Sequence, residues 1–177
     1  MTLLRAFLVS LRVDQWLKNA FVLAPLIFAR HLFDTAFVTR VVMYAGLFCL
    51  VSSAVYLFND FIDREKDLLH PEKKNRPIAS GLLPQSVAVF SAAILAALGI
   101  GCAFVLSDNA GMILTLYAAN NLLYSLALKR VAILDVMLIA AGFVLRVIGG
   151  AYVIDVEASV WLILCTFLIS LFLGFVS

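Results

Sequence analysis

Long apolar stretches recur along the chain, separated mostly by short polar connections. A helix that crosses a bilayer needs about 20 mainly apolar residues, so these stretches predict six membrane spans. The predicted spans cover residues 17–33, 41–58, 85–106, 110–128, 131–154 and 158–176. No alternating pattern competes with them. We therefore predict an all-α, polytopic membrane helical bundle that forms a single membrane domain over residues 1–177.

The two ends of the chain extend this pattern. Residues 3–11 carry apolar side chains at helical spacing opposite Arg5 and Arg12, which predicts a short amphipathic helix in the membrane interface. Pro25 interrupts the first predicted span. Residues 171–177 are still apolar and have no polar cap, so we expect the sequence to stop within a helix, as in a chain truncated at its C-terminus.

Composition and charge placement agree with a membrane protein. The chain is 64% hydrophobic and 14% charged, and its mean hydropathy of +1.09 excludes an ordinary soluble domain. Ten of its 13 Lys and Arg residues fall on one predicted side, whereas only Arg30 and Arg40 fall on the other. The basic side should be cytoplasmic. We expect a multi-pass protein of the inner (plasma) membrane whose polar segment 59–84 faces the cytoplasm, without a nucleic-acid partner and with oligomerisation left open.

An acidic pattern, N-D-x-x-D-x-x-x-D, begins where the second predicted span ends. If the helix continues, about 100° per residue places its polar members close to one stripe. Clustered carboxylates repel one another unless a cation joins them, and Mg²⁺ prefers oxygen ligands shared with substrate phosphates. The candidate metal ligands are Asn59, Asp60, Asp63 and Asp67. The alternative is a solvated helix end whose charges are satisfied by Arg64 and Lys66.

Two basic clusters lie on the same predicted side. Lys73 and Arg76 follow the acidic pattern and could neutralise phosphate oxygens, although an ordinary positive-inside loop has the same composition. The segment of Tyr124, Lys129 and Arg130 returns to that side after the fourth span and could also supply phosphate-binding cations.

Two ionisable residues fall inside the fifth predicted span, where charge is costly and a functional role is the default expectation. Asp135 and Arg146 are 11 residues apart, about 16 Å along a helix, so they cannot pair directly. Asp135 is close enough to the cytoplasmic end to join a polar chamber there. Arg146 lies deeper, where it belongs either to the site or to a brace between helices.

The acidic pattern resembles the first aspartate-rich motif of the UbiA-type intramembrane prenyltransferase superfamily. Residues 15–19, 75–81, 134–136 and 142–146 are similar to blocks of its decaprenyl-phosphate phosphoribosyltransferase branch. The resemblance implies a Mg²⁺-dependent transfer of 5-phosphoribose from phosphoribosyl diphosphate to a polyprenyl (decaprenyl) phosphate, in the synthesis of cell-wall arabinan precursors. The lipid phosphate is already anionic, so this reaction needs no general base.

Carried onto this chain, the resemblance implies a Mg²⁺ diphosphate site at Asn59 with three catalytic aspartates, which are Asp60, Asp63 and Asp67. It also implies phosphate contacts by Lys18, Lys73, Arg76, Lys129 and Arg130. Together with the residues placed at the polar end by the sequence pattern, the predicted substrate-binding residues are Lys18, Asn19, Asn59, Lys73, Arg76, Tyr124, Lys129, Arg130 and Asp135.

Three departures from the family pattern stand out. Val13 replaces a frequent proline, and the spacing of Tyr124 and Lys129 exceeds the Tyr-x-x-x-Lys of prenyl-transferring relatives by one residue, which favours the phosphoribosyl branch. Members have about nine spans and a second polar motif on later helices. We therefore expect that this chain lacks part of the active site and is inactive alone.

Two other functions remain open. A prenyltransferase that moves an isoprenoid from its diphosphate to an aromatic or lipid acceptor would use the same acidic motif. A transporter or membrane assembly subunit would instead use Asp135 and Arg146 along an ion pathway, but it leaves the clustered aspartates unexplained.

Overall fold

A computed structural model describes residues 2–128 and 132–176 of the chain, and within these ranges the regular elements are helices without a strand. The prediction of an all-α fold is therefore confirmed. The elements in chain order are α1 (Leu3–Ser10), η1 (Val13–Leu23), α2 (Ala24–Phe28), α3 (Thr35–Leu69), η2 (Lys73–Asn75), α4 (Gln85–Leu106), α5 (Asp108–Leu123), η3 (Tyr124–Leu128), α6 (Ala132–Val153) and α7 (Val160–Val176).

Three of the predicted spans form single helices that are long and apolar enough to cross a membrane, by length and composition alone. They correspond to α3, α4 and α6. The last predicted span forms the shorter apolar helix α7, and the fourth divides into α5 and the π-helical η3. Helix α7, with 17 residues, is at the lower end of the length range of a crossing helix, and α5 runs directly into η3.

The first predicted span falls on helical elements, and the helix type changes next to Pro25, where the sequence predicted an interruption. It divides into the 3₁₀ segment η1 and the five-residue α2, and Pro25 lies in the first turn of α2. Proline fits the start of a helix because its missing N–H would have no intrahelical partner there. The proline thus marks the junction between two short elements.

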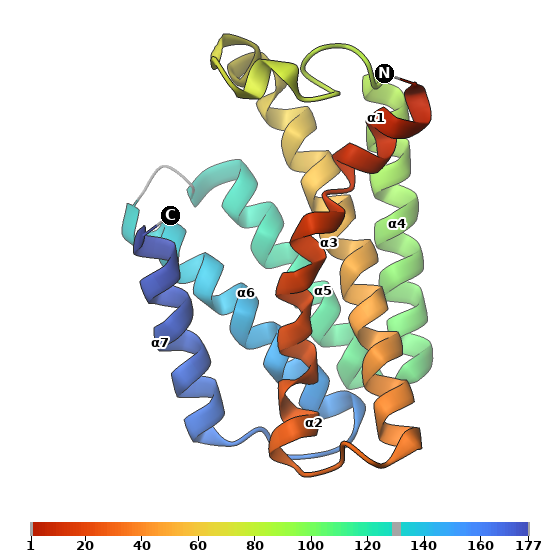
Figure 1. Ribbon diagram of the computed structural model, residues 1–177, viewed down its shortest axis with the longest axis vertical. Coiled ribbons are helices and arrows are strands. Elements are labelled where there is room, and N and C mark those ends of the chain that lie inside the picture. The colour runs from red at the N-terminus through yellow and green to blue at the C-terminus, as the bar shows by residue number, and fades with distance from the viewer. Residues whose placement is uncertain (1, 129–131, 177) are drawn as a thin grey trace.

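The long helices pack as sequential neighbours, from α3 against α4 through to α6 against α7 (Figure 1). Short connections and side-chain caps enforce this order. Ser107, in the turn between α4 and α5, accepts a hydrogen bond from the Ala110 amide at 3.1 Å. Asp34 caps α3 in the same way. These caps satisfy amides at helix ends that have no partner within the helix.

Arg146 lies in the middle of the bundle and is 6% exposed. Its Nε donates to Asn19 Oδ1 of η1 at 2.8 Å, and its Nη2 donates to the Tyr117 hydroxyl of α5 at 2.9 Å. Its Nη1 donates to the Gly142 carbonyl at 2.9 Å. Of the two roles open to Arg146, these contacts favour the brace between helices.

Helix α6 also approaches η1 closely. A methyl group at Gly150 would overlap the carbonyl oxygen of Val22 and lie 2.9 Å from its carbonyl carbon. Only glycine lets the two backbones come this near without displacement. Gly150 and Arg146 together fix η1 against α6. The η1 segment follows α1 and Arg12, which lie at the acidic end of the bundle.

Candidate functional site

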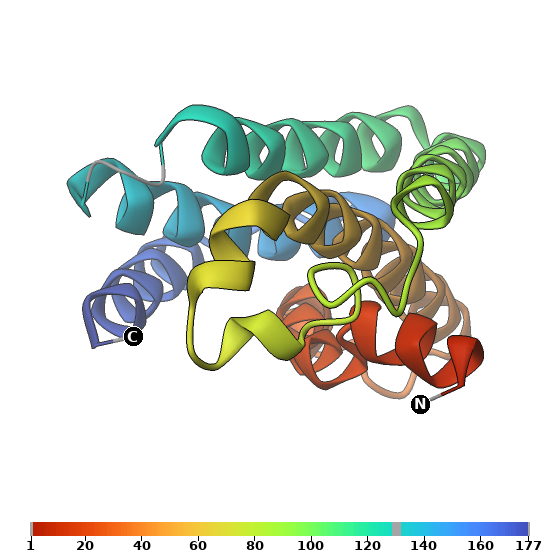
Figure 2. The same cartoon turned by 90° about the horizontal axis from the view of Figure 1, so that it is seen from above.

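Helix α3 runs 35 residues and continues past its apolar part to Leu69, so the acidic pattern lies on a regular helix. At about 100° per residue, Asp60 and Asp67 lie within about 20° of each other around the axis, and Asn59 and Asp63 lie within about 40°. The stripe therefore has two edges. Seen from this end of the molecule, the last turns of α3 lie between α1 on one side and α5 on the other (Figure 2).

The first edge is an ion-pair cluster. Arg12 Nη2 donates to Asp60 Oδ1 at 2.6 Å, and Arg76 Nη1 lies 3.2 Å from Asp60 Oδ1 and 2.7 Å from Asp67 Oδ2. Both carboxylates are buried, being 3% and 4% exposed as residues. Arg76 bridges the two aspartates, so their mutual repulsion is offset by cations from two other segments of the chain.

Local backbone structure brings these two arginines to α3. Arg12 joins α1 to η1 with φ of 50°, a left-handed conformation that is uncommon for a residue with a side chain. Its guanidinium also lies 4.9 Å from the centre of the Tyr56 ring. Arg76 follows η2, and the loop after it is anchored by the buried side chains of Ile78 and Leu83 against α3 and α4.

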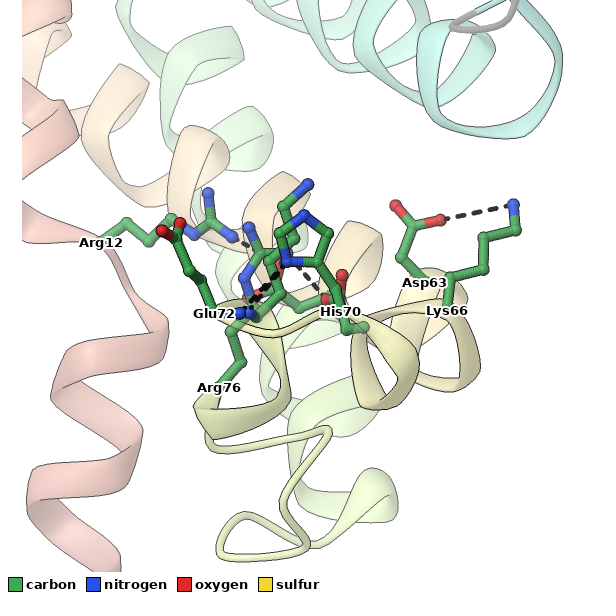
Figure 3. Close-up of polar contacts among 9 residues, drawn as sticks. Arg12, Asp63, Lys66, His70, Glu72 and Arg76 are labelled. Atoms are coloured by element: carbon green, nitrogen blue, oxygen red, sulfur yellow. Dashed lines mark hydrogen bonds and ion pairs between the residues drawn. The ribbon is translucent and has the colours of Figure 1, made fainter.

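The second edge of α3 presents Asp63. Its carboxylate lies 3.9 Å from Lys66 Nζ, and the pair lies apart from Arg12 and Arg76 (Figure 3). Asp63 is also near enough to Tyr124 of η3 to act on it electrostatically, and Tyr124 hydrogen-bonds the side chain of Asp135 on α6. Helix α3 and the later segments η3 and α6 thus bring Asp63, Tyr124 and Asp135 into one polar region.

Two side-chain oxygens at this end are buried without a hydrogen-bond partner in the described ranges, namely Asn59 Oδ1 and Asp135 Oδ1. A buried acceptor of this kind needs a partner, and an ion or ligand is one explanation. Both atoms are oxygens, the type of ligand atom that Mg²⁺ prefers. Within the described residues, however, no three His, Cys, Asp or Glu side chains converge to hold a metal by themselves.

The remaining predicted site residues are spread more widely. Lys18 and Lys73 are exposed, and Asn19 is buried at 1% exposure, where it accepts from Arg146 and donates to Ser52 Oγ at 3.2 Å. Asn19 is thus placed in the brace and not beside the acidic end of α3. Lys129 and Arg130 lie outside the described residues.

Sequence reasoning missed Arg12 and Tyr56 as parts of this region. Tyr56 precedes Asp63 by seven residues, close to two helical turns, so the helical pattern carried a signal for it. No sequence signal joins Arg12 to Asp60, because 48 residues separate them.

The chain is similar to known proteins over most of its length. The model of the UbiA prenyltransferase family matches residues 20–176. Decaprenyl-phosphate phosphoribosyltransferase of Mycolicibacterium smegmatis is 36% identical over 93% of this chain and 53% of its own length. The protein of the same name from Corynebacterium glutamicum is 37% identical over 93% of this chain and 51% of its own length.

A solved structure gives the same picture of the fold. A UbiA homolog from Archaeoglobus fulgidus, bound to DMAPP and Mg²⁺, superposes with a TM-score of 0.78 at 18% identity, over 93% of this chain and 60% of that one. This chain spans about half the length of the curated relatives it matches. Because the family model covers most of its residues, the chain belongs to the UbiA prenyltransferase family.

Proposed function

We propose that the protein containing this chain transfers 5-phosphoribose from phosphoribosyl diphosphate to a polyprenyl phosphate, with Mg²⁺ as cofactor. The observation that carries the proposal is the similarity, at 36% and 37% identity over 93% of the chain, to two decaprenyl-phosphate phosphoribosyltransferases. The polar end of the bundle supports it, because carboxylates and arginines gather there beside apolar helices.

Asp63 is the strongest candidate for a metal ligand on this chain. It lies on the edge of α3 away from the Arg12 and Arg76 cluster, and its neighbour Asn59 offers a buried oxygen without a partner. Asp60 and Asp67 would complete the predicted set but share Arg76. When bound, Mg²⁺ would supply positive charge to the leaving diphosphate. The A. fulgidus homolog, which holds Mg²⁺, supports a divalent metal.

The side chains of this chain would then act by position and charge. Arg12 and Arg76 form ion pairs with the buried aspartates and so fix the end of α3, with Asp63 on its other edge. Lys73 is exposed on η2 and is available for phosphate oxygens of either substrate. The acceptor phosphate is anionic, so orientation and charge neutralisation supply most of the rate acceleration.

The placement of Lys and Arg residues supports the orientation that we propose, in which the acidic end of α3 lies on the cytoplasmic side of the plasma membrane. Arg12 and Arg76 pair with the aspartates at that end, and Lys73 belongs to η2, which follows α3 there. Helix α1 lies at the same end (Figure 1). A hydrophilic sugar diphosphate would reach the site from the cytoplasm. The lipid acceptor would reach it from the membrane.

Prenyl transfer is the second candidate. It is favoured by the family to which the chain belongs and by DMAPP in the A. fulgidus homolog. It places the isoprenoid on the donor, whereas the phosphoribosyl reaction places it on the acceptor. The family assignment gives no support to a transporter or assembly subunit.

The test uses the complete natural protein in detergent or liposomes. Radiolabelled phosphoribosyl diphosphate is supplied with a polyprenyl phosphate, with and without Mg²⁺, and label is measured in extracted lipid. Mg²⁺-dependent labelling is the expected result. If lipid stays unlabelled while an isoprenoid diphosphate is consumed in the presence of an aromatic acceptor, the prenyl reaction replaces the proposed one.

A further inference from the structure

Asp135 has an unusual position for a carboxylate. It lies in the first turn of α6, one edge of its side chain is hydrogen-bonded to Tyr124, and its Oδ1 atom is buried without a hydrogen-bond partner in the described part of the chain. A buried carboxylate oxygen strongly favours a hydrogen-bond donor. Among the described residues, no donor meets this oxygen.

Electrostatic interactions and helix packing place Asp135 near the candidate site. The Tyr124 hydroxyl that holds Asp135 is also within electrostatic reach of Asp63 and Tyr56. Asp63 and Tyr56 lie on the same face of α3, since seven residues make close to two turns. Helices α3 and α6 are in contact, as are α6 and η3. Asp135 therefore belongs to the same polar region as Asp63, where the donor substrate is proposed to bind.

The chemistry of a carboxylate restricts which part of a substrate can lie against it. Phosphate oxygens are anionic acceptors, so a carboxylate repels them unless a cation lies between. A hydroxyl group donates a hydrogen bond and fits directly. Among the substrates considered, the ribose of phosphoribosyl diphosphate carries hydroxyls at C2 and C3, whereas an isoprenoid diphosphate has no hydroxyl.

We propose that Asp135, oriented by Tyr124, accepts hydrogen bonds from the ribose hydroxyls of the donor and so selects a sugar diphosphate over an isoprenoid diphosphate. This inference rests on the proposed function. A site built to bind a hydroxyl discriminates strongly against an analogue that lacks it, because the buried acceptor is then left unpaired. Asp135 would be a binding and specificity residue, and Tyr124 a positioning residue.

Asp108 provides a matched control. It lies in the first turn of α5, as Asp135 does in α6, but it is exposed and at the opposite end of the bundle. An acidic residue in a first turn interacts favourably with the helix dipole. If Asp135 acted only in that way, Asp135→Asn and Asp108→Asn would have similar consequences.

The experiment compares kcat/KM for phosphoribosyl diphosphate and for its 2-deoxy and 3-deoxy analogues, using the complete natural protein and its Asp135→Ala, Asp135→Asn and Asp108→Asn variants. In the unsubstituted protein, removing a hydroxyl that contacts Asp135 should lower kcat/KM about 10- to 100-fold. In Asp135→Ala, removing the same hydroxyl should lower kcat/KM by less than about 3-fold. In Asp108→Asn, removing it should lower kcat/KM as much as in the unsubstituted protein. Inhibition by inorganic diphosphate with Mg²⁺ should be unchanged in all variants, which also shows that they are folded.

The outcomes separate the two proposals. One outcome would overturn the inference while the proposed function stands. The unsubstituted protein would transfer phosphoribose, but the drop in kcat/KM from the natural donor to each deoxy analogue would be no larger than in Asp135→Ala. Asp135 would then not contact the hydroxyls. An equal loss for all donors, together with a higher Mg²⁺ requirement, would instead make Asp135 a metal ligand and overturn the inference. If no phosphoribose is transferred at all, the proposed function fails, and the inference fails with it.

Discussion

Replacing Arg146 by methionine tests how the bundle is held together. The guanidinium makes three hydrogen bonds, at 2.8, 2.9 and 2.9 Å, and its carbon lies 4.6 Å from the centre of the Tyr117 ring. Methionine keeps the length of the side chain and loses every donor. Asn19 Oδ1 and the Tyr117 hydroxyl would each lose a charged donor in a buried environment.

The expected cost follows from these contacts. A hydrogen bond to a charged group contributes about 1.5–3 kcal/mol, and removing one side of a buried charged pair costs about 3–5 kcal/mol. We therefore expect Arg146→Met to lower the free energy of unfolding by about 3–5 kcal/mol, which in a chain of this size lowers Tm by roughly 6–20 °C. Arg146→Lys should recover only part of this loss, because an ammonium cannot reproduce the planar fork of donors.

The assay is thermal unfolding in detergent, followed by the fraction of protein that remains monodisperse. Arg40→Met is the control, because Arg40 is an exposed arginine on α3, and its effect should stay within about 0.5 kcal/mol. A double-mutant cycle that combines Arg146→Met with Asn19→Ala should give a coupling energy between the two residues above about 0.5 kcal/mol. Equal Tm values for Arg146→Met and Arg40→Met would refute the bracing role.

Three further predictions concern the site and its support. Asp63→Asn should lower phosphoribose transfer at least about 100-fold with little change in Tm, whereas the exposed neighbour Glu65→Gln should keep activity; equal activities would remove Asp63 from the site. Gly150→Ala should cost about 1–3 kcal/mol in thermal unfolding, because its methyl group overlaps the Val22 carbonyl, while Gly46→Ala, with open space around it, should be neutral or stabilising by up to about 1 kcal/mol. Chelation of divalent metal by EDTA should stop transfer and added Mg²⁺ should restore it; transfer that persists in EDTA would contradict a metal-dependent reaction.

The sequence alone could predict the parts of the fold that depend on local pattern. Apolar runs identified α3, α4 and α6, because the length of a crossing helix is set by the thickness of the bilayer. It also predicted that the acidic pattern lies on a continuing helix, which α3 confirms. The sequence located the first span and its interruption at Pro25, but not the 3₁₀ geometry of η1, because apolar composition is the same in a 3₁₀ segment and in an α-helix.

The site shows the same division between local and distant information. Residues on one helix, such as Asp60 and Asp63, could be placed from their spacing, because helical geometry is fixed. The partners of these residues could not be placed. Arg12 lies 48 residues from Asp60 in the sequence. The ion pair between them depends on the left-handed backbone conformation of Arg12 between α1 and η1, which the sequence pattern does not predict.

The sequence by itself therefore determined an all-helical membrane bundle, its acidic helix end and its resemblance to a family. Only the tertiary structure decided that Asp60 and Asp67 pair with arginines, that Asp63 shares a polar region with Tyr124 and Asp135, and that Arg146 braces Asn19. The physical reason is the range of the interactions. Hydrophobic periodicity and helix spacing act within a few turns, whereas ion pairs and buried hydrogen bonds join residues that only chain packing brings together.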